Sequence, residues 1–159
     1  MPRIDDYINA RKLAVEKLSR ASFEIIAERS GFEPSDGQSL HIPFLDRTYL
    51  VSFPLFEFTD QADNQKEVPI QEQVLILHYL MAAETPDLSG QWVSYREIPG
   101  ASFYFGAFVK RAVDPLKKVF GQNISGFVRA AEKLQARKIE NGDAGFEFIM
   151  FPAVPRNSP

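Results

Sequence analysis

The sequence predicts an α+β fold, and three observations support that class. Apolar residues recur at three- and four-residue spacing near the N-terminus, in the middle and in the C-terminal half, which is typical of amphipathic helices. Residues 39–58 instead alternate apolar and polar side chains, as half-buried strands do. The chain of 159 residues is long enough to bury a core without a disulfide or a metal. Helical and strand segments are therefore separated along the chain, which is the pattern of α+β proteins.

An N-terminal helix is expected over residues 4–29, where Ile8, Val15 and Leu18 begin an apolar stripe. Two aspartates in its first turn suit the positive end of the helix dipole. Gly31 is expected to end the helix, because glycine adopts the left-handed conformation at little cost.

Antiparallel strands are expected over residues 39–58, with a tight connection at Asp46 and Arg47. Pro43 and Pro54 have no amide hydrogen to donate, so the strands that hold them are expected at a sheet edge or to end nearby. The polar residues 33–37 and 59–67 predict turns or loops on either side of the strands.

A central, buried helix is expected over residues 69–84, because its side chains are apolar on nearly every face. Pro69 suits the first turn of this helix, and Pro86 is expected to end it.

The C-terminal half predicts further helices and a last strand. Helical patterns cover residues 101–112, 114–120 and 125–138, a short strand is expected at 92–95, and the last strand is expected at 144–151. We expect one globular domain over residues 1–159, in which about residues 152–159 form an extended, proline-rich tail.

Composition excludes several classes of function. The net charge is −3 and the basic residues are scattered among acidic ones, so we expect no nucleic-acid partner. The chain has no cysteine, which excludes iron–sulfur ligation, thiolate zinc sites, cysteine nucleophiles and disulfides within it. The two histidines do not have the spacing of a metal site. We therefore expect neither a bound metal nor a cofactor.

The hydropathy pattern predicts a cytoplasmic protein with no membrane partner. The longest apolar run, residues 74–83, is interrupted by His78 and is too short to cross a bilayer. The first twelve residues carry charges without the apolar stretch of a signal peptide.

His78 and its neighbour Tyr79 form the first candidate binding position. A histidine within an apolar helix is costly unless its ring nitrogens find hydrogen-bond partners. One interpretation is a tuned acid, base or ligand. The other is a core histidine bonded to a backbone carbonyl or to a tyrosine.

The second candidate is the cluster Tyr95, Arg96 and Glu97, with Tyr104 nearby. Arg96 has the geometry to clamp a small anionic ligand with paired donors, and Glu97 is a candidate base. Alternatively, the two residues form an internal ion pair that fixes the following turn. The sequence contains no phosphate-binding loop, no dinucleotide fingerprint and no serine-nucleophile elbow, so catalytic residues stay unknown and an enzymatic activity stays open.

Four motifs in order resemble a known family: ILHYL at residues 76–80, LSGQWVSYREIPG at 88–100, the pair Phe120–Gly121, and FPAVP at 151–155. Together they are similar to the prokaryotic family called domain of unknown function 3786, from roughly Gly31 to Pro155. Its members occur mostly in anaerobic bacteria and archaea, and some carry an additional four-cysteine iron–sulfur domain. The resemblance implies a setting near redox or corrinoid chemistry but no established activity. Because this chain has no cysteine, any cluster would belong to a partner. The chain also ends soon after the last motif, so we expect a short or truncated member.

Two function hypotheses follow. The first is a non-catalytic binding or interaction module that serves a protein partner carrying an iron–sulfur or corrinoid centre. The second is a small-ligand-binding protein or an enzyme with a site around His78, Arg96 and Glu97.

Overall fold

The computed structural model describes residues 3–82 and 90–151. The contacts of the chain divide it into two compact units: unit 1 contains residues 1–87 and 149–159, and unit 2 contains residues 88–148. The expected end of the central helix at Pro86 and the expected tail at 152–159 lie outside the described residues. The single domain over 1–159 stays a prediction.

Unit 1 begins with two helices, α1 (Ile4–Leu18) and α2 (Phe23–Ser30), so the expectation of one helix over residues 4–29 is wrong. The break has a local cause. Ser22 adopts an extended conformation with φ −73° and ψ 156°, and its hydroxyl accepts the N–H of Ile25 as the N-cap of α2. Gly31 ends α2 in the left-handed conformation with φ 72°, as predicted.

A four-stranded antiparallel sheet follows, in the order β1 (Glu33–Ser35), β2 (Ser39–Phe44), β3 (Arg47–Ser52) and β4 (Glu57–Asp60). Residues 33–37 were expected to form only a turn, but the first three of them pair with β2. The tight connection predicted at Asp46 and Arg47 is formed by Leu45 and Asp46, since Arg47 begins β3 and is paired with Phe44. Pro43 lies beyond the residues of β2 that pair with β1, so its missing amide hydrogen faces an open edge.

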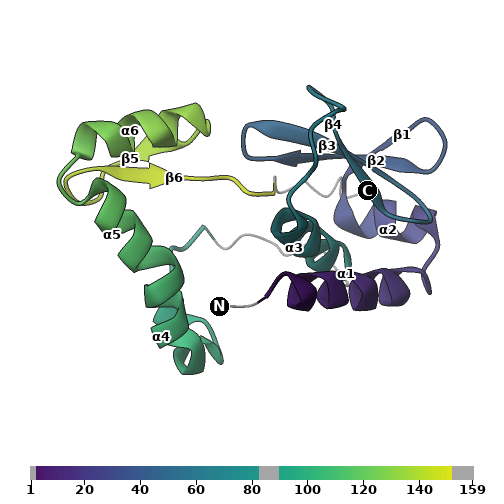
Figure 1. The fold of residues 1–159 in the computed structure, drawn as a ribbon, viewed down its shortest axis with the longest axis horizontal. Coiled ribbons are helices and arrows are strands. Elements are labelled where there is room, and N and C mark those ends of the chain that lie inside the picture. The colour runs from purple at the N-terminus through teal and green to yellow at the C-terminus, as the bar shows by residue number, and fades with distance from the viewer. Residues whose placement is uncertain (1–2, 83–89, 152–159) are drawn as a thin grey trace. The chain divides into compact units, whose positions relative to one another are not determined.

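The core of unit 1 lies between the sheet and the helix α3 (Ile70–Leu80), which is visible between the sheet and α1 in Figure 1. From α3, Ile76, Leu77 and Leu80 are fully buried against sheet residues such as Ile42 and Val51. The sequence prediction that this helix forms part of the core is therefore confirmed. Burial of these side chains is the main favourable term in the folding of this unit.

Unit 2 consists of helical segments followed by a two-stranded hairpin (Figure 1). Its elements are the 3-10 turns η1 (Tyr95–Glu97) and η2 (Ala101–Tyr104), α4 (Phe105–Phe108), a π-helical turn η3 (Val109–Val113), α5 (Asp114–Phe120), α6 (Ile124–Lys133), β5 (Arg137–Ile139) and β6 (Gly145–Glu147). The chain is thus α+β, with the order of elements predicted from the sequence.

Three expectations for unit 2 are wrong in detail. The short strand at 92–95 is absent from the described residues, because residues 91–94 are irregular and Tyr95 begins a 3-10 turn. The helix expected over 125–138 ends at Lys133, since Gln135 has a positive φ of 60° and the chain then enters the hairpin. The last strand covers only Gly145–Glu147.

No helix in the described part of the chain combines the length and the apolar character needed to cross a membrane.

Candidate functional site

His78 lies on the exposed side of α3. Three residues, Gln71, Leu75 and His78, form an exposed stripe along this helix, at the three- and four-residue spacing of one helical face. The expectation that α3 is buried on nearly every side is therefore wrong, as is the interpretation of His78 as a core histidine. His78 belongs to unit 1, whereas Tyr95, Arg96, Glu97 and Tyr104 belong to unit 2.

Tyr79 packs into the core of unit 1. Its ring stacks on that of Phe151 with centroids 4.2 Å apart, and it also meets Phe32 at 5.6 Å. Burial raises the pKa of the Tyr79 phenol. Two of the four sequence motifs, at residues 76–80 and 151–155, thus meet through this ring pair. Tyr79 is therefore a packing residue that holds Phe151 against the core.

Glu97 is occupied by a local backbone contact. Its carboxylate accepts the N–H of Ser94 at 2.6 Å, and the two residues form a capping box around η1. The Ser94 backbone N–H, and then the Ser94 hydroxyl, lower the pKa of Glu97. A lower pKa makes a carboxylate a weaker base. The spacing Ser-x-x-Glu in the sequence is the signal of this capping role.

Arg96 lies over an aromatic ring. Its guanidinium carbon is 4.0 Å from the centre of the Phe105 ring, a cation–π contact. Within residues 3–82 and 90–151, Arg96 takes part in no ion pair with Glu97 or with another carboxylate. The ring contact, rather than the internal ion pair considered from the sequence, is what positions this side chain.

Two of the predicted site residues do share a cavity. A cavity of about 320 Å³ is lined by Tyr95, Tyr104, Ala107, Phe108, Arg111 and Ala112. The Tyr95 ring stacks on Phe108 in parallel, with centroids 4.2 Å apart and planes 6° apart. Tyr104 is 60% exposed, so a face of its ring is open to a ligand. Neither Arg96 nor Glu97 lines this cavity.

The cation that lines the cavity is Arg111, which is not among the site residues predicted from the sequence. Arg111 is exposed and forms no ion pair with another described residue. The position of Arg111 depends on the π-helical turn Val109–Val113, which no pattern in the sequence predicts. Pro115 provides a physical reason for an irregular helix here, because it has no N–H to donate to the carbonyl four residues earlier, that of Arg111.

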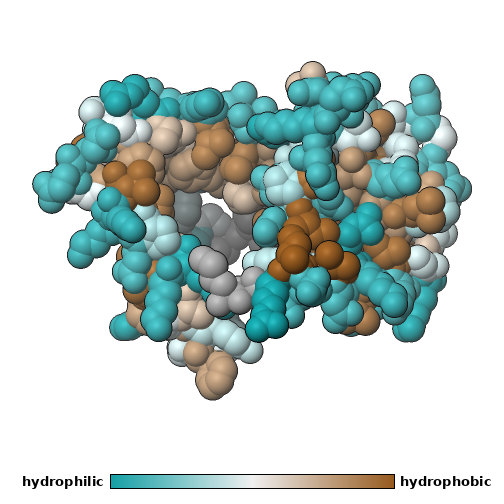
Figure 2. Space-filling model, viewed as in Figure 1, coloured by the Kyte–Doolittle hydropathy of each residue, from teal (hydrophilic) through white to brown (hydrophobic). Residues whose placement is uncertain are grey.

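A second notable surface of unit 2 is the apolar side of its main helical segment. Val109, Ala112, Val113, Leu116, Val119 and Phe120 recur at three- and four-residue spacing. We call this stripe the α5 face. Leu116 is 52% exposed and Val119 is 63% exposed. In Figure 2, apolar atoms are visible over the region that α5 and α6 occupy in Figure 1.

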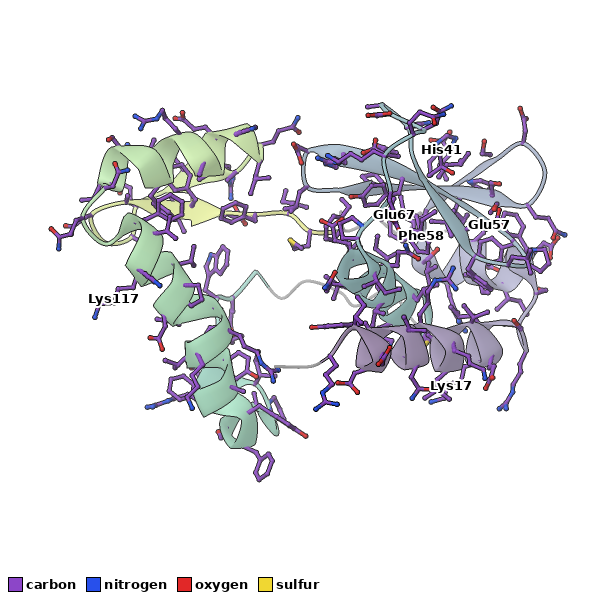
Figure 3. The ribbon with its side chains drawn as sticks, viewed as in Figure 1. Lys17, His41, Glu57, Phe58, Glu67 and Lys117 are labelled. Carbon is purple, nitrogen blue, oxygen red and sulfur yellow. The ribbon has the colours of Figure 1, made fainter. Side chains whose placement is uncertain are left out.

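Unit 2 buries little of its own apolar surface. Among its described residues, 90–148, only Ala101 and Ala131 are buried. Lys110, Lys117 and Lys118 accompany the α5 face on the same helical segment, and Figure 3 shows Lys117 extending from α5 into solvent. The surface thus combines apolar side chains with positive charge.

The polar cavity of unit 1 is built around an internal ion pair. This cavity of about 580 Å³ includes Arg47 and Asp60, whose charged atoms are 2.9 Å apart. His41, labelled in Figure 3, shares a hydrogen bond of 2.9 Å between its Nδ1 and the side-chain amide of Gln61. No group of three or more potential metal ligands is found among the described residues. The ion pair and the hydrogen bond are contacts typical of the edge of a sheet and of the loop that follows it.

Comparison with known proteins identifies the family of the chain. A search of the curated proteins and a search of the solved structures each found no match. A family model, described as Domain of unknown function (DUF3786), matches residues 22–156, which includes described residues of both units. The chain therefore belongs to the DUF3786 family.

Proposed function

We propose that this protein is a cytoplasmic, non-catalytic interaction module that binds a protein partner through the α5 face. The observation that carries the proposal is the exposure of this amphipathic helix. An apolar stripe of this width is normally packed against a core, yet Val113, Leu116 and Val119 are exposed. Exposed apolar surface that is rimmed by charge is typical of protein interaction sites.

Unit 1 provides the comparison within the same chain. It also exposes single apolar residues, among them Ile4, Ile8 and Leu75, but its helices bury their opposite sides in a continuous core. Isolated exposed apolar residues are normal in proteins. The α5 face is different, because only Ala101 and Ala131 are buried among the described residues of unit 2. Phe120, at one end of the face, is half-buried and packs edge-on against Phe127.

The charge of this surface indicates the chemistry of the partner. Lys110, Lys117 and Lys118 favour a partner with acidic residues around an apolar centre, since complementary charge speeds association and selects partners. The family resemblance favours a partner that carries an iron–sulfur or corrinoid centre. Such a centre would be held by the partner, because this chain offers no cysteine ligand.

Affinity capture from the native organism tests the proposal. The tagged chain is expected to retain one protein that contains iron or cobalt by elemental analysis. Leu116→Asp and Val119→Asp place a charge within the apolar contact and are expected to weaken capture by about tenfold or more. Both positions are exposed, so the variants are expected to melt within a few degrees of the wild type.

Lys138→Asp is the matched control, because it introduces the same acidic side chain at an exposed position of the same unit, on β5. Capture by this variant is expected to match the wild type. Loss of capture by all three variants would indicate a general charge effect, and retention by all three would exclude the α5 face.

The alternative of a site around His78, Arg96 and Glu97 finds less support in the geometry. His78 lies in a different unit from the other two residues, and Glu97 is committed to its capping box. A small anionic ligand fits better beside Arg111.

A further inference from the structure

We propose that the cavity lined by Tyr95, Tyr104, Phe108 and Arg111 binds a small planar carboxylate. This site goes beyond the proposed protein interface, because it takes a ligand of a different class and shares only Ala112 with the α5 face. The inference rests on the aromatic walls, on a cation that forms no ion pair with a described residue, and on the irregular helical turn that carries this cation.

The aromatic walls favour a flat ligand. Tyr95 and Phe108 are stacked in parallel and hold each other in place, and Phe105 packs beside both, with centroids 6.3 Å and 6.2 Å away. The Arg96 guanidinium lies 4.0 Å from the centre of the Phe105 ring and adds a cation–π contact to this cluster. Tyr104 meets Phe103 edge-on at 5.1 Å and leaves much of its own ring exposed. A planar ring is the ligand shape that stacks best on such surfaces.

The cation favours a carboxylate. Arg111 reaches the cavity from the same helical segment as Ala107 and forms no ion pair within the described part of the chain. An unpaired guanidinium beside aromatic rings offers two parallel donors to the two oxygens of a carboxylate. Tyr95 and Tyr104, which also line the cavity, each carry a hydroxyl that can donate or accept a hydrogen bond.

The π-helical turn gives the cavity its shape. Arg111 and Ala112 both belong to the turn Val109–Val113, in which the chain departs from α-helical spacing. Such turns are rare and occur frequently at functional sites. Ala107 and Ala112 line the cavity with small side chains, which leaves its volume open.

The volume of this open cavity indicates the scale of the ligand. Ligand cavities in proteins are commonly about 300–1,000 Å³. At about 320 Å³ this cavity lies at the lower end of that range, which fits a carboxylate with one or two fused rings.

Titration of the whole chain with naphthoate, followed by NMR of the backbone amides, tests the proposal. Saturable binding is expected, with the largest shifts among the amides of residues 104–112. Naphthamide has the same rings without the charge, and decahydronaphthoate has the same charge without planar rings. Both are expected to bind at least about tenfold more weakly, since each loses one of the two interactions.

Arg111→Gln is expected to weaken naphthoate binding by about tenfold or more and to leave naphthamide binding unchanged. Lys110→Gln removes the neighbouring charge, which does not line the cavity, and is expected to change naphthoate binding by less than about twofold. Ala107→Phe fills the cavity and is expected to abolish binding. A melt of each variant checks that the fold is kept.

Equal losses in Arg111→Gln and Lys110→Gln would overturn the proposal, because they would show attraction by charge alone. Decahydronaphthoate binding as tightly as naphthoate, full binding by a folded Ala107→Phe variant, or no saturable naphthoate binding by the wild type would each overturn it as well.

Discussion

Two buried polar side chains stand opposite each other on neighbouring strands of unit 1. Tyr49 of β3 is paired in register with Asp60 of β4. The Tyr49 hydroxyl donates to Glu72 of α3 at 2.7 Å, and Asp60 accepts from Arg47 at 2.9 Å and from the N–H of Ala62 at 3.0 Å. Each buried group is thereby satisfied, as a buried polar group must be if the fold is to be stable.

Tyr49 is expected to make the protein sensitive to alkaline conditions. Burial, followed by the hydrogen bond to Glu72, raises the pKa of its phenol above the ordinary value of about 10. The protonated phenol therefore contributes stability that is fully present below about pH 10 and is lost as the pH rises toward the higher folded pKa.

Urea melts at neutral pH and above pH 10 measure this effect. The wild type is expected to lose up to about 1.4 kcal/mol per pH unit from this group, whereas Tyr49→Phe should lose less over the same interval. Tyr79 is present in both proteins, so any alkaline loss of stability that it causes is common to both. Equal alkaline losses in the two proteins would show that Tyr49 does not carry the effect.

Asp60 is expected to contribute more to stability than an exposed acidic residue of the same region. Asp60→Ala leaves Arg47 and the Ala62 amide without their acceptor and should cost about 1–3 kcal/mol in the free energy of unfolding. Glu67→Ala, in the exposed loop shown in Figure 3, should change it by less than about 0.5 kcal/mol. A similar cost for both substitutions would refute a structural role for the Arg47–Asp60 pair.

At the scale of elements, α3 combines a buried side with an exposed stripe. This division predicts which of its leucines contribute to the free energy of unfolding. Leu77 is fully buried and Leu75 is exposed. Leu77→Ala leaves a cavity and should cost about 2–5 kcal/mol, whereas Leu75→Ala should cost less than about 1 kcal/mol. Urea unfolding of both variants measures the difference. A loss below about 1 kcal/mol for Leu77→Ala would mean that α3 is peripheral.

The elements that the sequence predicted well are those whose signal is local. The alternation in β2 and β3, the turn at Asp46 and the glycine that ends α2 each depend on neighbouring residues. The break between α1 and α2 was missed, because the apolar spacing continues across Ser22 while its side chain caps the next helix. The exposed stripe of α3 was also missed, because Leu75 is apolar and only packing shows that it faces outward.

The candidate site was predictable only in part for the same reason. The sequence singled out Tyr95 and Tyr104, and the structure places both on one cavity. It did not single out Arg111, because the π-helical turn that brings this residue to the cavity has no sequence pattern of its own. Glu97 and Arg96 instead have roles set by immediate neighbours, Ser94 and Phe105.

At the scale of the whole molecule, the chain is expected to bind metal neither tightly nor stoichiometrically. It has no cysteine and only two histidines. Elemental analysis of the purified chain should find less than one iron or zinc ion per molecule. One tightly held ion that is lost on His78→Ala would contradict this expectation and would favour a metal-dependent activity.

The proposed interaction depends on how burial differs between the two units. Unit 1 has a continuous core, whereas unit 2 leaves Val113, Leu116 and Val119 of the α5 face exposed. A module with this division is expected to present unit 2 to its partner and to rely on unit 1 for much of its folding stability.

Photo-cross-linking in the native organism shows what covers the α5 face. A benzoylphenylalanine in place of Leu116 is expected to form one covalent adduct with a partner protein that contains iron or cobalt. The same residue in place of Lys138, on the exposed strand β5, is expected to form none. An adduct within the chain itself, or with a second copy of it, or adducts of equal yield from both positions, would contradict the account of this protein as an interaction module.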